Sequence, residues 1–239
     1  MRILEKTILF LDDITDFGLI IIFCIFFFIG GYSAYDSFML YGQVKDSNIQ
    51  RLKPGRERMS TEEIEQEIDG KMVAWITVDG TVIDYPIMQG EDNSEYLNKD
   101  PFGEYSLAGS IFLDSRNEPD FTDYYNLIYG HHMEHYLMFG ALDKYLEEGY
   151  LEEHSTGKLI VGETTYKIKF FSVMEAPATN QAIFGPTEYD QQTMPYTLEH
   201  SLYIDKESLP KEGEKLIALS TCKTPNTADR TIVMGKLLK

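Results

Sequence analysis

The sequence predicts a mostly β domain that folds as a closed or nearly closed barrel, with short connecting helices and one membrane-spanning helix in front of it. From Met72 onward the chain consists of short runs rich in β-branched and aromatic residues, separated by turn residues. Ahead of them lies a long apolar stretch without charges. With 239 residues, the chain has room for one domain of ordinary size behind such a segment.

The charge of the chain excludes one class of partner. Lys and Arg number 21 against 39 Asp and Glu, which gives a formal net charge of −18 at pH 7. Such a chain repels a phosphate backbone, so nucleic acid is not an expected partner. Hydrophobic residues make up 43% of the chain, which is too rich in core-forming side chains for a disordered protein.

The apolar stretch at 17–35 is long enough to cross a hydrocarbon core of roughly 30 Å. We therefore expect an uncleaved membrane anchor over 17–39. The alternative is a cleaved signal peptide, which requires a basic segment in front of the apolar one. The flank here is mostly acidic: it contains Arg2 and Lys6 beside Glu5, Asp12, Asp13 and Asp16.

The orientation of this anchor stays open on charge alone. The positive-inside rule would place the following domain in the cytoplasm, because basic residues follow the apolar stretch. These residues are Lys45, Arg51, Lys53, Arg56 and Arg58. Long domains translocate largely regardless of flanking charge, so the rule decides little here.

Between the anchor and the domain, residues 41–59 are polar and basic and contain the pair Pro54-Gly55, which is typical of a stalk or a short helix. Ser60, with Glu63 three positions later, forms a capping-box pattern and predicts that a helix begins there. Gly70 is its expected end.

The first strands are predicted as a hairpin, because Asp79 and Gly80 separate the β-rich runs 72–78 and 81–88. Further strands are expected at 110–113, 125–129, 159–161, 166–173, 215–220 and 231–238. A helix is expected over 138–148 from the spacing of Leu142, Tyr145 and Leu146, and a short helical turn over 198–203.

The chain has two cysteines, Cys24 and Cys222, and only the second lies in the predicted domain. Because Cys24 lies in the apolar stretch, the two occupy different environments and are not expected to form a disulfide. Cys222 follows the apolar run LIALST and precedes the turn-rich KTPNTADR, so it lies at a strand end facing a loop. This position suits a nucleophile, since the strand is rigid and the loop gives access. The alternative is a buried cysteine without a role.

His131 likewise follows an apolar run, NLIYG, and can reach the end of a neighbouring strand. A surface or capping histidine is the alternative. His131 and His135 have the i, i+4 spacing of a zinc site on a helix. However, Glu134 is in the wrong place for the HExxH motif and no third ligand is evident, so no metal is expected.

Arg230 begins the last predicted strand, eight positions after Cys222 (230 − 222 = 8). A strand–loop–strand connection of this length can return the arginine to the side of the cysteine. The alternative is a surface arginine paired with Asp229 or another carboxylate, which contributes little energetically.

Three segments together resemble the signatures of the sortase family in the right order: YGHHM at 129–133, LSTC at 219–222 and DRTIVMGKL at 229–237. The best match is to class B sortases. Likeness to that class also runs through WITVDGTVIDYPIMQGEDN at 75–93 and GSIFLD at 109–114. The resemblance therefore covers nearly the whole of 75–237.

This resemblance implies an eight-stranded sortase barrel with N-terminal helices packed on it. It also implies that His131, Cys222 and Arg230 are the catalytic residues, while His132 and His135 are bystanders. Sortases act outside the membrane of Gram-positive cells, so the resemblance favours an extracytoplasmic domain. One departure from the class B pattern lies between 184 and 216, where a longer helix is usual. Three prolines break that pattern here: Pro186, Pro195 and Pro210.

The implied activity is that of a cysteine transpeptidase that cleaves the C-terminal sorting signal of secreted proteins after threonine. An acyl-enzyme then passes the protein to an amine of the cell-wall precursor, with no metal or organic cofactor. Three alternatives are pilin polymerisation through a lysine amine, thiol-dependent hydrolysis, and a non-catalytic binding domain. The expected organisation is a cytoplasmic N-terminus at 1–16, the anchor at 17–39, a stalk and helix at 40–71, and the catalytic domain at 72–239.

Overall fold

The computed structural model describes residues 2–44, 47–54, 68, 71–222 and 229–239. Its residues divide into two compact units, Met1–Gln43 and Val44–Lys239. The helix predicted to begin at Ser60 falls outside the described residues.

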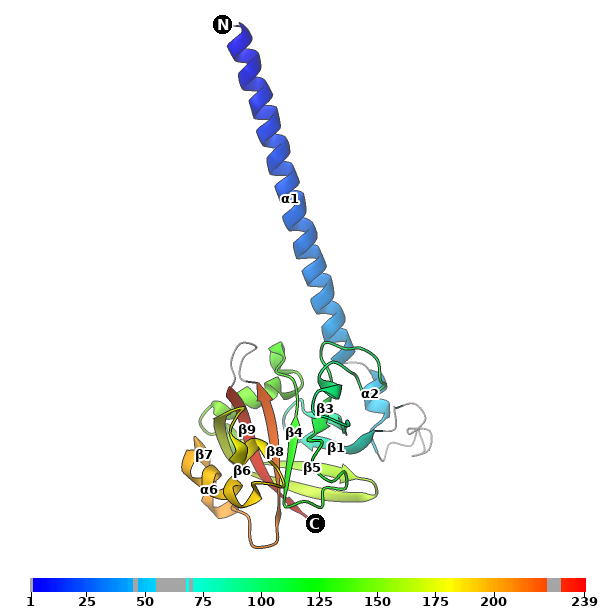
Figure 1. Ribbon diagram of the computed structural model, residues 1–239, viewed down its shortest axis with the longest axis vertical. Helices are drawn as coiled ribbons and strands as arrows, with labels where there is room; N and C mark the ends of the chain where they lie inside the picture. The colour runs from blue at the N-terminus through cyan, green and yellow to red at the C-terminus, as the bar shows by residue number, and fades with distance from the viewer. Residues whose placement is uncertain (1, 45–46, 55–67, 69–70, 223–228) are drawn as a thin grey trace. The chain divides into compact units, whose positions relative to one another are not determined.

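The first unit is formed by α1 (Arg2–Val44), a single long helix (Figure 1). Its segment Thr15–Tyr35 has 21 residues and a mean hydropathy of 2.3, and none of it is buried. At about 1.5 Å per residue this segment is long enough to cross a bilayer core. Among the described residues it is the one helix with the length and composition of a membrane span.

The second unit contains a closed β-barrel of eight strands (Figure 1). Its strands follow the ring order β5, β1, β2, β3, β4, β8, β9 and β6, and β6 pairs back with β5. The short β7 pairs with β6 outside the ring. The strands are β1 (Met72–Val78), β2 (Asp84–Met88), β3 (Ile111–Leu113), β4 (Tyr125–Tyr129), β5 (Thr156–Val161), β6 (Thr164–Pro177), β7 (Tyr203–Ile204), β8 (Lys215–Cys222) and β9 (Asp229–Leu238).

The predicted eight-stranded barrel is therefore confirmed, including its first hairpin. β1 and β2 pair antiparallel, and the Val78 amide donates to the Ile83 carbonyl at 2.9 Å to close the connection between them. Gly80 in this turn has φ of +74°, a left-handed conformation that glycine adopts without steric penalty.

Two strand pairs in the ring are parallel, β2 with β3 and β4 with β8, and the other pairs are antiparallel. In the β4–β8 pair, Tyr129 lies opposite Ser220. Parallel strands end at the same edge of a sheet, so the segments that follow Tyr129 and Ser220 leave the barrel side by side.

Short helices connect the strands. They are α2 (Ser47–Arg51), η1 (Glu95–Leu97), η2 (Glu134–Tyr136), η3 (Phe139–Leu146), α4 (Tyr150–Glu153), α5 (Gln181–Phe184), α6 (Asp190–His200) and η4 (Lys206–Ser208). The helix expected over 138–148 is present as the 3₁₀ helix η3, in which Leu142 and Tyr145 are buried. α2 is followed by Leu52, which is fully buried against Trp75 of β1.

The connection between β6 and β8 differs from the expectation. The helical turn predicted over 198–203 is confirmed for 198–200, the end of α6, and is wrong beyond it, because Tyr203 begins β7. α6 also continues through Pro195, which removes one backbone hydrogen bond. Buried hydroxyls hold this helix: Thr193 donates to the Ala182 carbonyl and Thr197 donates to the Thr193 carbonyl, each at 2.8 Å.

A core of apolar side chains from β4, β6, β8 and β9 packs the strands that carry the predicted site. Helix α5 contributes Ile183 and Phe184 to the same core. Its strand members are Tyr125, Leu127, Phe171, Met174, Ala176, Leu216, Ala218, Ile232 and Met234.

Candidate functional site

Three strand ends meet at one edge of the barrel and bring the predicted site residues together. Cys222 at the end of β8 lies directly opposite Arg230 near the start of β9. Cα atoms of such antiparallel partners are about 4.5–5.5 Å apart. Tyr129 of β4 and Ser220 of β8 are partners in a parallel pair. His131 lies two positions after Tyr129, and Cys222 lies two positions after Ser220, so both follow the same point of the pair. The Gly130 amide donates to the Ser220 carbonyl at 3.1 Å.

A pocket of about 240 Å³ opens at this edge, and His131 and Arg230 both line it. The backbone of Cys222 lies at the same edge, at the end of β8 and paired with Arg230. The lining residues are Asn93, Leu97, Phe112, Tyr129, Gly130, His131, Ala178, Phe184 and Arg230. The wall is mostly apolar and aromatic, with a few polar groups, which is typical of a site that binds an organic ligand.

His131 is held by a contact with η1. Its Nε2 lies 2.6 Å from the Leu97 carbonyl oxygen. A carbonyl only accepts hydrogen bonds, so Nε2 carries a proton in this arrangement. Nδ1 is then the nitrogen of the neutral ring that can accept a proton, and the imidazolium can donate from it.

Arg230 lies against an aromatic shelf formed by Tyr129 and Phe184. The two rings stack with their centroids 6.5 Å apart and an interplanar angle of 15°. The guanidinium carbon of Arg230 is 5.7 Å from each ring centroid. Cation–π attraction therefore orients the guanidinium. The pair with Asp229 considered from the sequence is not among the ion pairs of the described residues.

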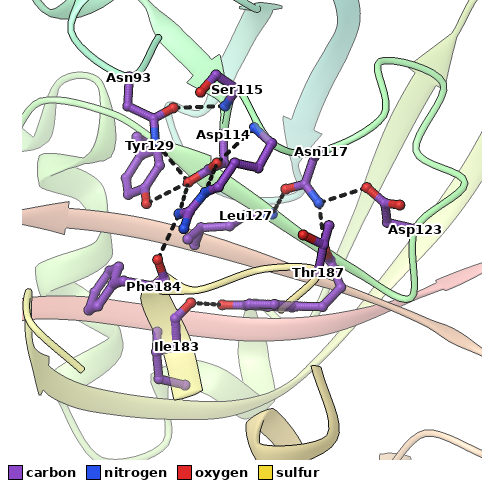
Figure 2. Close-up of polar contacts among 12 residues, drawn as sticks. Asn93, Asp114, Ser115, Asn117, Asp123, Leu127, Tyr129, Ile183, Phe184 and Thr187 are labelled. Carbon is purple, nitrogen blue, oxygen red and sulfur yellow. Dashed lines mark hydrogen bonds and ion pairs between the residues drawn. The ribbon is translucent and has the colours of Figure 1, made fainter. Parts of the chain in front are cut away.

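Next to the shelf lies a polar network, centred on the buried Asp114, that the sequence did not reveal (Figure 2). Asp114, which follows β3 and is fully buried, forms a bidentate pair with Arg116 through Nε at 2.9 Å and Nη2 at 2.8 Å. The same carboxylate accepts from Asn93 Nδ2 at 2.9 Å and from the Tyr129 hydroxyl at 3.0 Å. Arg116 Nη2 also donates to the Phe184 carbonyl at 2.7 Å. Asn93, Tyr129 and Phe184 all line the pocket.

The network keeps Asp114 ionised. Burial alone would raise the pKa of this carboxyl, but the hydrogen bonds and charge of Arg116, with the Tyr129 hydroxyl, lower the pKa below its usual value. The hydrogen bond to Asp114 in turn raises the pKa of Arg116. Burial, followed by the charge of Asp114, raises the pKa of Tyr129, so its phenol stays protonated and continues to donate.

The segment after His131 is strained. His135, Tyr136 and Met138 have φ of +57°, +59° and +52°, a conformation that non-glycine residues rarely adopt. His135 therefore does not share a regular helix face with His131, and the i, i+4 zinc spacing is not realised. His132 Nε2 lies 2.6 Å from Asp143 Oδ2 in η3, a contact that ties the start of this segment to the barrel.

Comparison with known proteins gives one consistent family. A profile described as the sortase domain matches residues 76–238. Sortase B of Listeria monocytogenes is 35% identical over 180 residues, which cover 72% of this chain and 72% of that protein.

Solved structures agree with the profile. The structure of a Streptococcus pyogenes class B sortase involved in pilus biogenesis has a TM-score of 0.68 and 35% identity, and the match covers 76% of this chain and 100% of that one. A Staphylococcus aureus sortase B–substrate complex has a TM-score of 0.69 and 26% identity, over 87% and 98% of the two chains. This chain therefore belongs to the sortase family, within the class B enzymes, which are cysteine transpeptidases.

Proposed function

We propose that this enzyme cleaves the C-terminal sorting signal of secreted proteins after threonine and joins them, through an acyl-enzyme on Cys222, to an amine of the cell-wall precursor. The observation that carries the proposal is the register of β8 and β9, in which Cys222 and Arg230 are opposed. The same assignment is supported by the pocket, which both His131 and Arg230 line.

In the proposed first step the Cys222 thiolate attacks the threonine carbonyl carbon and forms a tetrahedral oxyanion. Neighbouring cations favour the thiolate over the thiol, and the His131 imidazolium and the Arg230 guanidinium are the cations proposed here. Collapse of the intermediate breaks the C–N bond, and His131 donates its proton to the leaving amine. The product is a thioester between Cys222 and the threonine.

In the second step an incoming amine attacks the thioester, and neutral His131 accepts its proton. Collapse of this intermediate releases the Cys222 thiolate and leaves an amide, so that all atoms balance without a cofactor. Arg230 donates hydrogen bonds to the oxyanion in both steps. Removing one such donor typically lowers the rate by roughly 100- to 1000-fold.

A second candidate differs only in the acceptor, which would be a lysine amine of a pilin subunit. It is favoured by the likeness to the Streptococcus pyogenes class B sortase, which is involved in pilus biogenesis. Covalent pilin ladders that disappear in a Cys222→Ala strain would support this acceptor over the cell-wall precursor.

The proposed placement is single-pass, with residues 1–16 in the cytoplasm, an anchor at 17–39, a stalk and helix at 40–71 and the catalytic domain at 72–239 outside the cell. The apolar helix segment Thr15–Tyr35 supports the anchor. The extracytoplasmic side is proposed because sorting substrates are secreted proteins. Protease accessibility of the domain on intact cells tests this orientation.

The catalytic proposal is tested with the full chain in detergent, a library of threonine-containing sorting-type peptides and an added amine. Mass spectrometry is expected to detect cleavage after threonine and a product that carries the amine. Cys222→Ala and His131→Ala should abolish both signals, because they remove the nucleophile and the proton donor. Arg230→Ala should lower the rate by roughly 100-fold or more.

The control is His200→Gln at the exposed end of α6, outside the residues that line the pocket, which leaves the three proposed residues in place and should keep the amine-linked product. Product formation that persists in Cys222→Ala would contradict the proposed nucleophile. Cleavage without any amine-linked product, at every amine concentration, would show a hydrolase instead of a transpeptidase.

A further inference from the structure

We propose that the Asp114–Arg116 ion pair is a positioning device for Arg230, acting through the rings of Tyr129 and Phe184. The proposal rests on the function proposed above, in which Arg230 holds the oxyanion. Neither member of the pair is among the residues that line the pocket, so their effect on the reaction would be indirect.

The carboxylate of Asp114 is the fixed centre of this device. It is fully buried and its two oxygens accept from five donors: the amide, Nε and Nη2 of Arg116, Asn93 Nδ2 and the Tyr129 hydroxyl. Asn93 is itself fixed, because its Oδ1 accepts from the Ser115 amide at 2.7 Å. A buried charge with this many donors has one low-energy geometry.

Arg116 holds the Phe184 ring indirectly, by a hydrogen bond to the Phe184 backbone. Arg116 Nη2 donates to the carbonyl of Phe184, which is the last residue of α5. The Tyr125 hydroxyl donates to the Ile183 carbonyl at 2.9 Å (Figure 2). These two carbonyls lie at the C-terminus of a helix, where they have no partner within the helix. Arg116 and Tyr125 therefore fix the end of α5 and the position of Phe184.

Tyr129 carries the first ring and is restrained on two sides. Its hydroxyl donates to Asp114, and its ring packs against Phe112 with centroids 5.3 Å apart. Both rings that contact Arg230 are thus tied to one ion pair. The guanidinium carbon is 5.7 Å from each ring centroid, so a shift of either ring changes one of the two cation–π contacts that orient it.

The first test is a double-mutant cycle between Arg116→Gln and Arg230→Lys, measured as kcat/KM on the peptide that the library identifies. Arg116→Gln removes the ion pair and should lower kcat/KM by roughly 10- to 100-fold, the scale of a small misplacement of a reacting group. If Arg116 acts through Arg230, the double variant should lose little more than Arg230→Lys alone. Losses that multiply would overturn the proposal.

The matched control is Asp84→Asn. Asp84 is a partly buried carboxylate whose pKa, like that of Asp114, is lowered despite the opposing effect of burial, and it accepts from Lys53, Trp75 and Thr77. It does not line the pocket. Any loss that Asp84→Asn causes should multiply with that of Arg230→Lys. If Arg116→Gln fails to fold, Tyr129→Phe is cycled with Arg230→Lys instead, because it removes one hydrogen bond and keeps the ring.

A second readout needs no substrate. The Arg230 Nε–H resonance, assigned with Arg230→Lys, should be shielded by the two rings and should move to a less shielded position in Arg116→Gln. An unchanged resonance would overturn the proposal even where activity falls.

The outcomes separate the proposal from the function it rests on. If the library peptides are cleaved in the wild type but Arg230→Lys has full activity, the function assigned to Arg230 fails and the positioning role fails with it. If Arg230→Lys is impaired, while Arg116→Gln has full activity and an unchanged resonance, only the positioning role fails. If no peptide is cleaved, the proposed function fails and takes this inference with it.

Discussion

A buried carboxylate is stable as an anion only while its donors compensate for lost hydration. Asp114 meets this condition with three donors from Arg116 and one each from Asn93 and Tyr129. Its lowered pKa means that the folded protein binds its proton less tightly than the unfolded chain does. By linkage, the ionised carboxylate stabilises the fold above the pKa of the unfolded chain, and this contribution is lost as pH falls through the folded pKa.

We therefore expect Asp114→Asn to lower the free energy of unfolding at pH 7 by about 2 kcal/mol, the scale for losing hydrogen bonds to a charged group, because the Arg116 side chain is 40% exposed and water can hydrate it once the carboxylate is gone. The difference between the variant and the wild type should begin to shrink below about pH 4, the pKa of an aspartate in the unfolded chain, and should disappear only as pH falls through the lowered pKa of the folded state. Urea unfolding between neutral and acidic pH measures both curves. A difference that stays constant over this range would contradict the assigned ionisation.

At the level of residues, the sequence predicted the residues proposed to react but not the network around them. His131, Cys222 and Arg230 each follow or begin a predicted strand, and their types suggested chemistry. Asp114 and Arg116 are two positions apart after a strand, a pattern typical of an ordinary turn. Their importance depends on Phe184, which lies 68 positions from Arg116 and comes near only through the barrel.

At the scale of elements, the segment between β4 and η3 carries His131 and includes three non-glycine residues with positive φ. Tight packing maintains this strain. Gly140 in η3 lies against the Met133 backbone so closely that a Cβ there would overlap the Met133 carbonyl oxygen. The segment is thus clamped against η3, and the Phe139 amide donates to the His131 carbonyl at 3.2 Å.

We expect Gly140→Ala to push this segment away from η3 and to lower both stability and activity. A small-to-large change in a packed site typically costs about 1–3 kcal/mol. Thermal unfolding and peptide cleavage measure the two effects. Gly162→Asn is the control, because Gly162 has open space around it and a φ of +54° that asparagine tolerates. Equal losses in both variants would contradict the clamp.

The elements show where sequence patterns are sufficient. The eight ring strands were predicted because each carries several β-rich residues in succession. β7 was missed since it contains two residues and depends on its pairing with β6. α6 was hidden by Pro195, whose effect is offset by two buried threonines: Thr193 donates to Ala182 outside the helix, and Thr197 donates to Thr193 within it.

At the scale of the whole molecule, the formal net charge of −18 opposes compaction. We expect the melting temperature to rise by about 2–4 °C for each 1 kcal/mol of repulsion that salt removes. A titration of NaCl from about 10 mM to about 100 mM shortens the Debye length from roughly 30 Å to roughly 10 Å and measures this. A melting temperature that falls with salt would show that ion pairs such as Lys53–Asp84 and Lys236–Glu214 outweigh the repulsion.

The ring order of the barrel places its last two strands in the sequence, β8 and β9, between β4 and β6. Until these two strands have been synthesised, β4 and β6 each have an unpaired edge. Closing the ring requires non-local contacts, such as that between Asn126 and Leu216, 90 positions apart, and contacts of this kind form slowly. β8 and β9 also carry Cys222 and Arg230, so a nascent or truncated chain without these strands lacks both of these proposed residues.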